Sequence, residues 1–271
     1  MMKRLQIAFE KYYAIFVMQY RTKAAYFSTL LSETPIIALR LWILSQFYNA
    51  TYQTYGLNDY KGLTIPALIW SIMFIQAFEG GSFPSISSII DEEIKSGSIA
   101  YTINRPYSYI LYQYVGYLGR TIPSLLVNVT GGAIAAWILV GPLPATWWTI
   151  LLGVFLMYVG YTLNFLIEIS IGLLGFWIED TESVAWLYQK AVLLLGGYFL
   201  PLTMFPDIAQ VIAQWLPFGA LYYGPAQLIV NFNLQTLYHF LAVQSIWLII
   251  SGIIAYFIFN RGMKHVSVQG G

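Results

Sequence analysis

The chain has 271 residues, of which 58% are apolar and 9% are charged, and its formal net charge is +1. Soluble domains carry roughly 25% charged residues, so this composition is typical of a protein embedded in lipid. The small net charge offers no basic field for nucleic acid, and the lack of cysteine excludes disulfides and thiolate metal sites. We therefore expect an all-α integral membrane protein whose surroundings are membrane lipid, with no nucleic-acid partner.

The first 24 residues mix aromatic and basic side chains and precede the first long apolar segment. They lack the compact apolar core and the small-residue cleavage site of a signal peptide. The pattern predicts an amphipathic helix over residues 1–24 that lies in the cytoplasmic interface, and the alternative is that it only lengthens the first span. The apolar residues that recur at helical spacing are Ile7, Ala8, Tyr12, Ile15, Phe16 and Tyr20.

Six segments are apolar and long enough to cross a bilayer, for which a helix needs about 20 residues. Placing the N-terminus in the cytoplasm leaves Lys61 outside and nearly all other loop lysines and arginines inside, so both termini are predicted to be cytoplasmic. We expect one transmembrane domain over residues 1–271 in the cell membrane. The predicted spans are Ala25–Tyr48, Leu63–Phe83, Tyr109–Leu139, Trp147–Ile178, Val184–Met204 and Leu237–Phe259.

The cytoplasmic loop over residues 84–108 carries the most informative local pattern. Gly97 is suited to end a helix that continues from the second span, and Ser98 is suited to cap a short helix over Ile99–Asn104. Pro106 then stops that helix before the third span. A stiff helix below the membrane fits contact with a partner, and the residues alone leave an ordinary amphipathic loop helix equally open.

The external segment over residues 205–236 is too apolar for a solvated loop. Ile208–Leu216 and Leu221–Ile229 predict two short helices, which Pro217 and Gly219 divide. Neither helix is long enough to span. A re-entrant pair that dips into the outer leaflet is expected, since non-crossing helices at membrane depth are tolerated when protein buries them.

Charged side chains within the predicted spans are costly and indicate function or specific packing. Arg40, Glu79, Arg120 and Glu168 are such residues, and Glu33 is another. At about 1.5 Å of rise per residue, Arg120 and Glu168 reach a similar depth. We predict that Arg120 pairs with Glu168 or with Glu79. An ion pair that fixes the register of the spans is the interpretation we favour, and a substrate path is the alternative.

The sequence contains no motif for catalysis by this chain. The P-loop pattern and the G-x-S-x-G pattern are absent, and His239 and His265 stand apart without clustered carboxylates. We expect no catalytic residue, no metal and no cofactor bound by this chain. A self-contained secondary transporter or channel is an alternative function, but it predicts inverted repeats, which we do not find.

Two motifs resemble the permease subunits of ABC-2 type exporters. The first is Glu93-x-x-x-Gly97-Ser98 followed by Pro106, although threonine is frequent in that family where this chain has Ser98. The second comprises the stretches over residues 197–206, 215–218 and 222–227. The resemblance covers essentially the whole chain. Within the family, the chain resembles the branch whose members are known as viologen or multidrug exporters.

The resemblance implies a fold like that of type V exporters and a function in export. It implies six spans, a coupling helix between spans 2 and 3 and the external re-entrant pair between spans 5 and 6. Two ABC ATPase subunits, which use ATP and Mg, would dock beneath two permeases that are identical or homologous. The substrate would be hydrophobic or amphipathic, drug-like or lipid-like.

The same resemblance implies two groups of site residues. Those implied in coupling to the ATPase are Glu92, Glu93, Gly97, Ser98, Tyr101, Asn104, Arg105 and Pro106. Those implied in an external gate are Pro201, Phe205, Pro206, Pro217, Tyr222 and Tyr223.

Overall fold

A computed structural model describes residues 2–59, 61–81 and 85–269, and every regular element within these ranges is helical. The last residues of the predicted span Leu63–Phe83, and Pro84 of the following loop, lie outside the described residues. Short 3-10 helices follow α8 and α9, namely η1 (Leu174–Phe176) and η2 (Leu202–Met204). The α-helices are α1 (Met2–Ala25), α2 (Phe27–Leu31), α3 (Glu33–Thr54), α4 (Ile65–Gly80), α5 (Ile86–Lys95), α6 (Ile99–Ile103), α7 (Tyr109–Val140), α8 (Trp147–Leu173), α9 (Thr181–Leu195), α10 (Asp207–Trp215), α11 (Pro217–Leu221), α12 (Tyr223–Val230) and α13 (Leu234–Gln269).

Within the described ranges, four stretches are long and apolar enough to cross a bilayer: Phe27–Thr54, Tyr109–Val140, Trp147–Phe176 and Leu234–Lys264. Helix α4 is apolar and almost wholly buried but has 16 residues, and α9 has 15. Both are therefore shorter than the roughly 20 residues that a simple span needs. The all-α membrane fold is confirmed, and the count of six spans stays a prediction.

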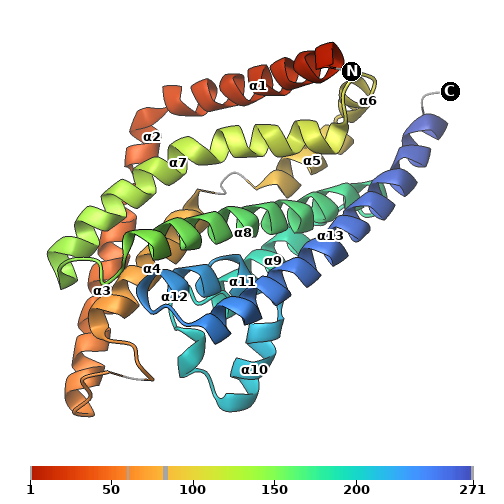
Figure 1. Cartoon of the computed structure of the whole chain (residues 1–271). Helices are drawn as coiled ribbons and strands as arrows, with labels where there is room; N and C mark the ends of the chain where they lie inside the picture. Colours follow the sequence, from red (N-terminus) through yellow and green to blue (C-terminus); the bar gives the residue numbers. More distant parts are fainter. Residues whose placement is uncertain (1, 60, 82–84, 270–271) are drawn as a thin grey trace.

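The N-terminal segment forms a helix of its own. The chain turns at Tyr26, after which α2 and α3 run in a different direction from α1 (Figure 1). Helix α1 lies alongside the first half of α7, where the Tyr12 hydroxyl accepts a hydrogen bond of 3.2 Å from the Ser108 N–H. A Cβ on Gly119 of α7 would come within 2.7 Å of the Phe16 carbonyl oxygen. The alternative that residues 1–24 only lengthen the first span is therefore wrong, and the interfacial location stays a prediction.

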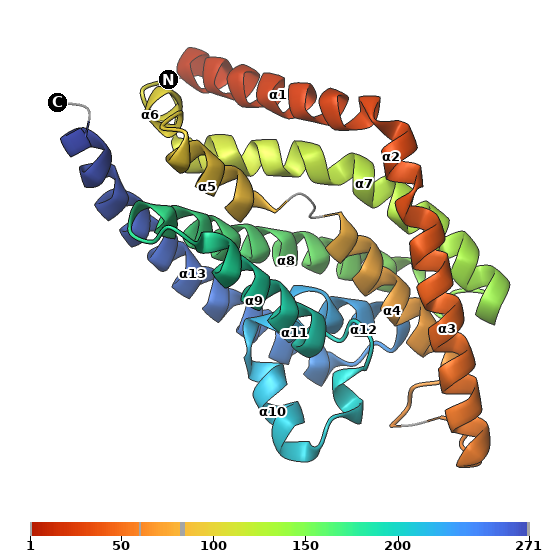
Figure 2. The same ribbon diagram turned by 180° about the vertical axis from the view of Figure 1, so that it is seen from behind.

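Helix α8 is the centre of the packing and contacts α5, α11, α12 and α13 (Figures 1 and 2). Glycine lets neighbouring backbones touch it directly, as is common where membrane helices pack. A Cβ on Gly172 would lie 2.7 Å from the Ser87 carbonyl oxygen of α5, and one on Gly160 would overlap the Leu221 carbonyl oxygen of α11. These close approaches fix the positions of α5 and α11 on α8.

The segment after α9 differs from its prediction. Helix α9 ends at Leu195, so the prediction of one continuous helix over Val184–Met204 is wrong. Gly196 follows the last turn, and Gly197 has a φ of +75°, a conformation that suits glycine and ends helices. The chain then continues irregularly to η2.

The predicted pair of short external helices is three helices in the structure. Helix α10 agrees with Ile208–Leu216 to within one residue at each end. The predicted Leu221–Ile229 is interrupted at Tyr222, whose φ of −134° separates α11 from α12. Every residue of α12 is buried, and the helix packs among α4, α8 and α13.

Candidate functional site

The region between α5 and α6 has the turn that the sequence predicts. Helix α5 ends at Lys95, and Gly97 adopts a φ of +71°. The Ser96 and Gly97 N–H groups donate to the carbonyl oxygens of Glu92 and Ile94, at 2.9 and 3.0 Å. Nothing lies within 4 Å of a Cβ built on Gly97, so backbone conformation is what favours glycine here. The role of Gly97 in ending a helix is confirmed, although the helix that it ends is α5, a separate element from α4.

Ser98 precedes α6 but does not cap it with its side chain, so that prediction is wrong. Its φ and ψ of −67° and −17° are already helical, whereas a capping residue is normally extended. Its hydroxyl instead lies 2.9 Å from the Ser96 Oγ and donates to the Glu93 carbonyl oxygen at 3.4 Å. Ser98 therefore closes the turn behind it.

Helix α6 has one inward side and one outward side. Ile99 is buried and Ile103 packs against the core. Tyr101 is 79% exposed, and Asn104, Arg105 and Pro106 are also exposed. The exposed side of α6 is therefore available to a partner.

Glu93 ties α5 to the beginning of α7. Its carboxylate accepts hydrogen bonds from the Tyr109 hydroxyl at 2.8 Å and from the Gln113 amide at 3.0 and 3.1 Å. Glu92 is exposed and makes no such link. Sequence reasoning missed Tyr109 and Gln113, because no local spacing relates them to Glu93.

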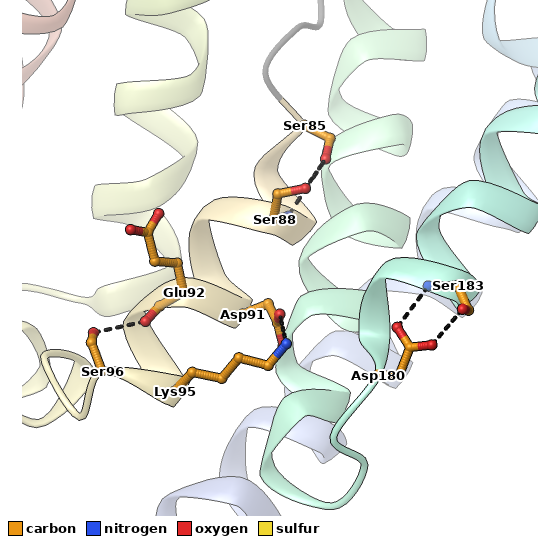
Figure 3. Close-up of polar contacts among 8 residues, drawn as sticks. All are labelled: Ser85, Ser88, Asp91, Glu92, Lys95, Ser96, Asp180 and Ser183. Carbon is orange, nitrogen blue, oxygen red and sulfur yellow. Dashed lines mark hydrogen bonds and ion pairs between the residues drawn. The ribbon is translucent and has the colours of Figure 1, made fainter.

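Polar contacts also order the facing ends of α5 and α9 (Figure 3). Lys95 forms an ion pair of 2.6 Å with Asp91, and this hydrogen bond raises the pKa of Lys95. Asp180 caps α9 by accepting from the Ser183 N–H at 3.1 Å, and the bond from the Ser183 hydroxyl lowers the pKa of Asp180. A groove of about 980 Å³ runs beside them, with Ser85, Ser88 and Asp180 among its lining residues.

The structure does not pair Arg120 with Glu168 or with Glu79. Glu168 accepts from the Ile86 N–H at 2.8 Å and from the Asn164 amide at 3.2 Å. Arg120 forms no ion pair with any described residue, and its Nη2 is buried without a hydrogen-bond partner. The predicted pairing is therefore wrong. Rise per residue gives the depth of a side chain, but it does not give the direction in which that side chain points around the helix axis.

Arg40 and Glu79 line one cavity of about 220 Å³ between α3, α4 and α7. The Arg40 guanidinium donates a hydrogen bond to the Tyr198 hydroxyl. Glu33 lines the same cavity and accepts from the Asn128 amide at 3.1 Å. Sequence reasoning placed these charges within spans but missed Asn128 and Tyr198, which are neutral.

Glu79 also lines a second cavity of about 80 Å³, which Glu168 lines as well. The structure thus brings Arg40, Glu79 and Glu168 to adjoining cavities, and it leaves Arg120 on α7, facing Gly116 and the neighbouring α1.

The residues predicted for an external gate are divided between the core and the surface. Pro217, Tyr222 and Tyr223 are buried, and the Tyr222 ring meets the Tyr161 ring at 5.8 Å between centroids. Pro201 is buried, Phe205 is half-buried and Pro206 is exposed. The buried members hold α11 and α12 against the body of the molecule.

Long apolar helices that carry buried charges and line polar cavities indicate an integral membrane protein. Comparison with known protein families matches residues 35–270 to the family described as ABC-2 family transporter protein. The chain belongs to this family, and it is an ABC-2 type permease. Such permeases are the membrane components of transporters and work with separate ABC ATPase subunits. A search of curated proteins finds no match.

Proposed function

We propose that the chain is the transmembrane permease subunit of an ATP-driven ABC exporter that moves a hydrophobic or amphipathic substrate out of the cytoplasm. Two ABC ATPase subunits, which use ATP and Mg, would drive it, and a second permease, identical or homologous, would complete the complex. Both termini would lie in the cytoplasm, and the membrane would be the cell membrane. The family supports the permease role, and the geometry of α6 supports the coupling.

The observation that carries this proposal is the placement of α6. It lies at the same end of the molecule as the beginning of α1 and the end of α13 (Figure 2). Ile99 anchors it, while Tyr101 presents most of its ring to the surroundings. Aromatic residues with such exposure are frequent energetic centres of protein interfaces. A groove on an ATPase subunit is the partner that this helix fits.

The surrounding contacts provide a route from α6 into the membrane helices. Gly97 and Ser98 join α6 to α5 through a closed turn. Glu93 then joins α5 to α7 through Tyr109 and Gln113, and Gly172 seats α5 on α8. A push on α6 would therefore reach two of the long helices.

The proposal is tested by co-purifying the permease with candidate ABC ATPase subunits and measuring transport together with ATP hydrolysis. Tyr101→Ala is expected to weaken the complex, or the coupling of hydrolysis to transport, by about tenfold or more, which is the scale of a modest interface centre. Tyr238→Ala is the matched control, because Tyr238 is 68% exposed at the opposite end of α13.

Normal assembly and coupling of both Tyr101→Ala and a Gly97/Ser98/Tyr101 triple variant would overturn the coupling role. Transport by the chain alone, without ATPase or ATP, would favour the alternative of a secondary transporter or channel.

A further inference from the structure

Arg120 is a charged side chain that the proposed function does not use. It lies on α7, where α1 packs alongside the first half of that helix in a line of contact that we call the α1–α7 seam (Figures 1 and 2). Its Nη2 is buried without a hydrogen-bond partner, and the guanidinium forms no ion pair with any described residue. A buried charge is costly unless an opposite charge accompanies it, so Arg120 indicates an anionic ligand from outside the chain.

Two glycines of α7 determine where the guanidinium lies. A Cβ on Gly119 would come within 3.0 Å of the Gln19 Cβ, so α1 touches α7 directly beside Arg120. A Cβ on Gly116 would lie 3.4 Å from the Arg120 Nη1 and 3.7 Å from the Gln19 Cγ. The guanidinium is therefore folded back over Gly116, as long side chains on helices lean toward the N-terminus. Arg120 is partly exposed, so a ligand can reach it from the edge of the seam.

The beginning of α7 adds hydroxyl groups and a second cation on the way to Arg120. Tyr112, Gly116 and Arg120 follow one another at four-residue spacing, which places them on one ridge of the helix. The Tyr112 ring stacks on the Tyr107 ring at 4.9 Å between centroids, and the Arg105 Nη1 donates to the Tyr107 hydroxyl at 3.1 Å. These groups are donors of the kind that bind phosphate oxygens.

The acidic residues nearby are engaged elsewhere, and α1 is basic. The Glu93 carboxylate accepts from Tyr109 and Gln113, and the Glu10 carboxylate accepts from the Gln6 amide at 3.1 Å. Glu10 is the one acidic residue in the sequence of α1. An excess of basic residues on a helix in the membrane interface attracts anionic lipid. The basic residues of α1 are Lys3, Arg4, Lys11, Arg21 and Lys23.

The outer side of α1 favours a lipid over a soluble anion. Phe9, Tyr13 and Met18 of α1 are each more than half exposed. Exposed apolar side chains gathered on one helix indicate contact with other apolar groups, which the tails of a lipid provide and a soluble phosphate does not.

We propose that the α1–α7 seam binds the phosphate headgroup of an anionic phospholipid and that Arg120 is its principal charge partner. The planar guanidinium matches two phosphate oxygens, Tyr112 supplies a hydroxyl donor, and the apolar side chains of α1 contact the tails. The inference rests on the predicted interfacial position of α1 and does not depend on the ATPase or on the transported substrate. Helix α1 precedes residues 35–270, so half of this site lies outside the part of the chain that matches the family.

The experiment titrates the purified, delipidated full chain in a neutral detergent with dioleoyl phosphatidylglycerol and, separately, with dioleoyl phosphatidylcholine. Native mass spectrometry gives the bound fraction of each. Wild type is expected to bind phosphatidylglycerol about tenfold more tightly than phosphatidylcholine, and Arg120→Gln is expected to lose this preference, as loss of one partner of a buried charge pair does. Arg261→Gln is the charge-matched control, because Arg261 is an exposed arginine of α13 on the same predicted side of the membrane.

Three results would overturn the proposal: equal binding of the two lipids by wild type, an unchanged preference in folded Arg120→Gln, or an equal loss in Arg261→Gln. Displacement of phosphatidylglycerol by an equimolar amount of glycerol 1-phosphate would assign the site to a soluble phosphate and also overturn it. If Arg120→Gln fails to fold, Arg120→Lys keeps the charge but not the planar fork, and it is expected to bind phosphatidylglycerol more weakly than wild type. Unchanged binding by that variant also counts against the proposal.

Thermal unfolding separates a lipid site from a packing role. Without added lipid, Arg120→Gln is expected to melt at the temperature of wild type or higher, because it removes a buried charge that has no partner. Phosphatidylglycerol is expected to raise the melting temperature of wild type but not that of the variant. A variant that melts below wild type without lipid, and that phosphatidylglycerol stabilises as much as wild type, would assign Arg120 to packing alone.

Discussion

Glu168 holds the beginning of a helix that belongs to another part of the chain. Its carboxylate accepts from the Ile86 N–H, the first residue of α5, at 2.8 Å. The first N–H groups of a helix have no partner within it, and a negative charge near them is favourable. An acidic side chain of α8 thus stabilises the start of the helix that leads to α6.

Replacing Glu168 by leucine is expected to lower the free energy of unfolding by about 1–3 kcal/mol, because the Ile86 N–H would be buried without an acceptor. Glu168→Gln keeps an acceptor oxygen and is expected to lose less than leucine does. Denaturation of the detergent-solubilised protein gives both values. A leucine variant as stable as wild type would show that Ile86 does not depend on this bond.

A double-mutant cycle with Arg120→Ala provides the control. Since Arg120 and Glu168 make no contact in the structure, the effects of Arg120→Ala and Glu168→Ala should add to within about 0.5 kcal/mol. A much larger coupling would restore the ion pair that the sequence suggested.

Sequence reasoning about single residues predicted the helix end at Gly97, but it did not predict the contacts of Glu168 or Arg40, which depend on the directions in which side chains of distant segments point. Gly97 was found because a helix end in the left-handed region favours glycine. The partner of Glu168 was missed because it is a backbone N–H, and pairing rules for charged side chains do not consider backbone donors. The cavity around Arg40 was missed because no rule of spacing brings Tyr198 to it.

At the scale of elements, direct contact between backbones fixes how α11 meets α8. Gly160→Val is expected to destabilise the protein by more than the roughly 1–3 kcal/mol of ordinary overpacking, since a Cβ would overlap the Leu221 carbonyl oxygen. Gly252→Ala on α13 is the matched control, because its Cβ would meet its nearest neighbour, Leu166, at 4.0 Å. Thermal unfolding in detergent measures both, and equal melting temperatures would contradict the packing described.

The beginnings of α7 and α8 were the most predictable boundaries of the fold, whereas the ends of α3, α8 and α13 differ from the predicted spans by several residues. Tyr109 and Trp147 begin α7 and α8 as predicted, because each starts a sustained apolar run after a polar or proline-containing loop. The end of α9 was not predicted, because the apolar stretch continues past it. Gly196 and Gly197 end the helix through their backbone conformation, which hydropathy does not reveal. Tyr222 similarly divides α11 from α12 within one apolar run.

At the scale of the whole molecule, the predicted topology places α6 and α10 on opposite sides of the membrane. The chain lacks cysteine, so a single introduced cysteine reports on its own position. Ile208→Cys is expected to react with a membrane-impermeant maleimide in intact cells, whereas Tyr101→Cys should react after permeabilisation. The two positions are matched, since each wild-type side chain is 79% exposed. Labelling of both from the same side would exclude the six-span topology.

The glycines of α8 have a mechanical consequence. Gly172 sets α8 against α5 near one end, and Gly160 sets it against α11 further along, in both cases backbone against backbone. Side chains at such contacts would absorb small displacements by changing rotamer, but backbones in contact have no such compliance. We expect α5, α8 and α11 to behave as a stiff lever, so that movement at the α6 end is delivered with little loss of amplitude to the buried Tyr222 and Tyr223, which lie where α11 ends and α12 begins.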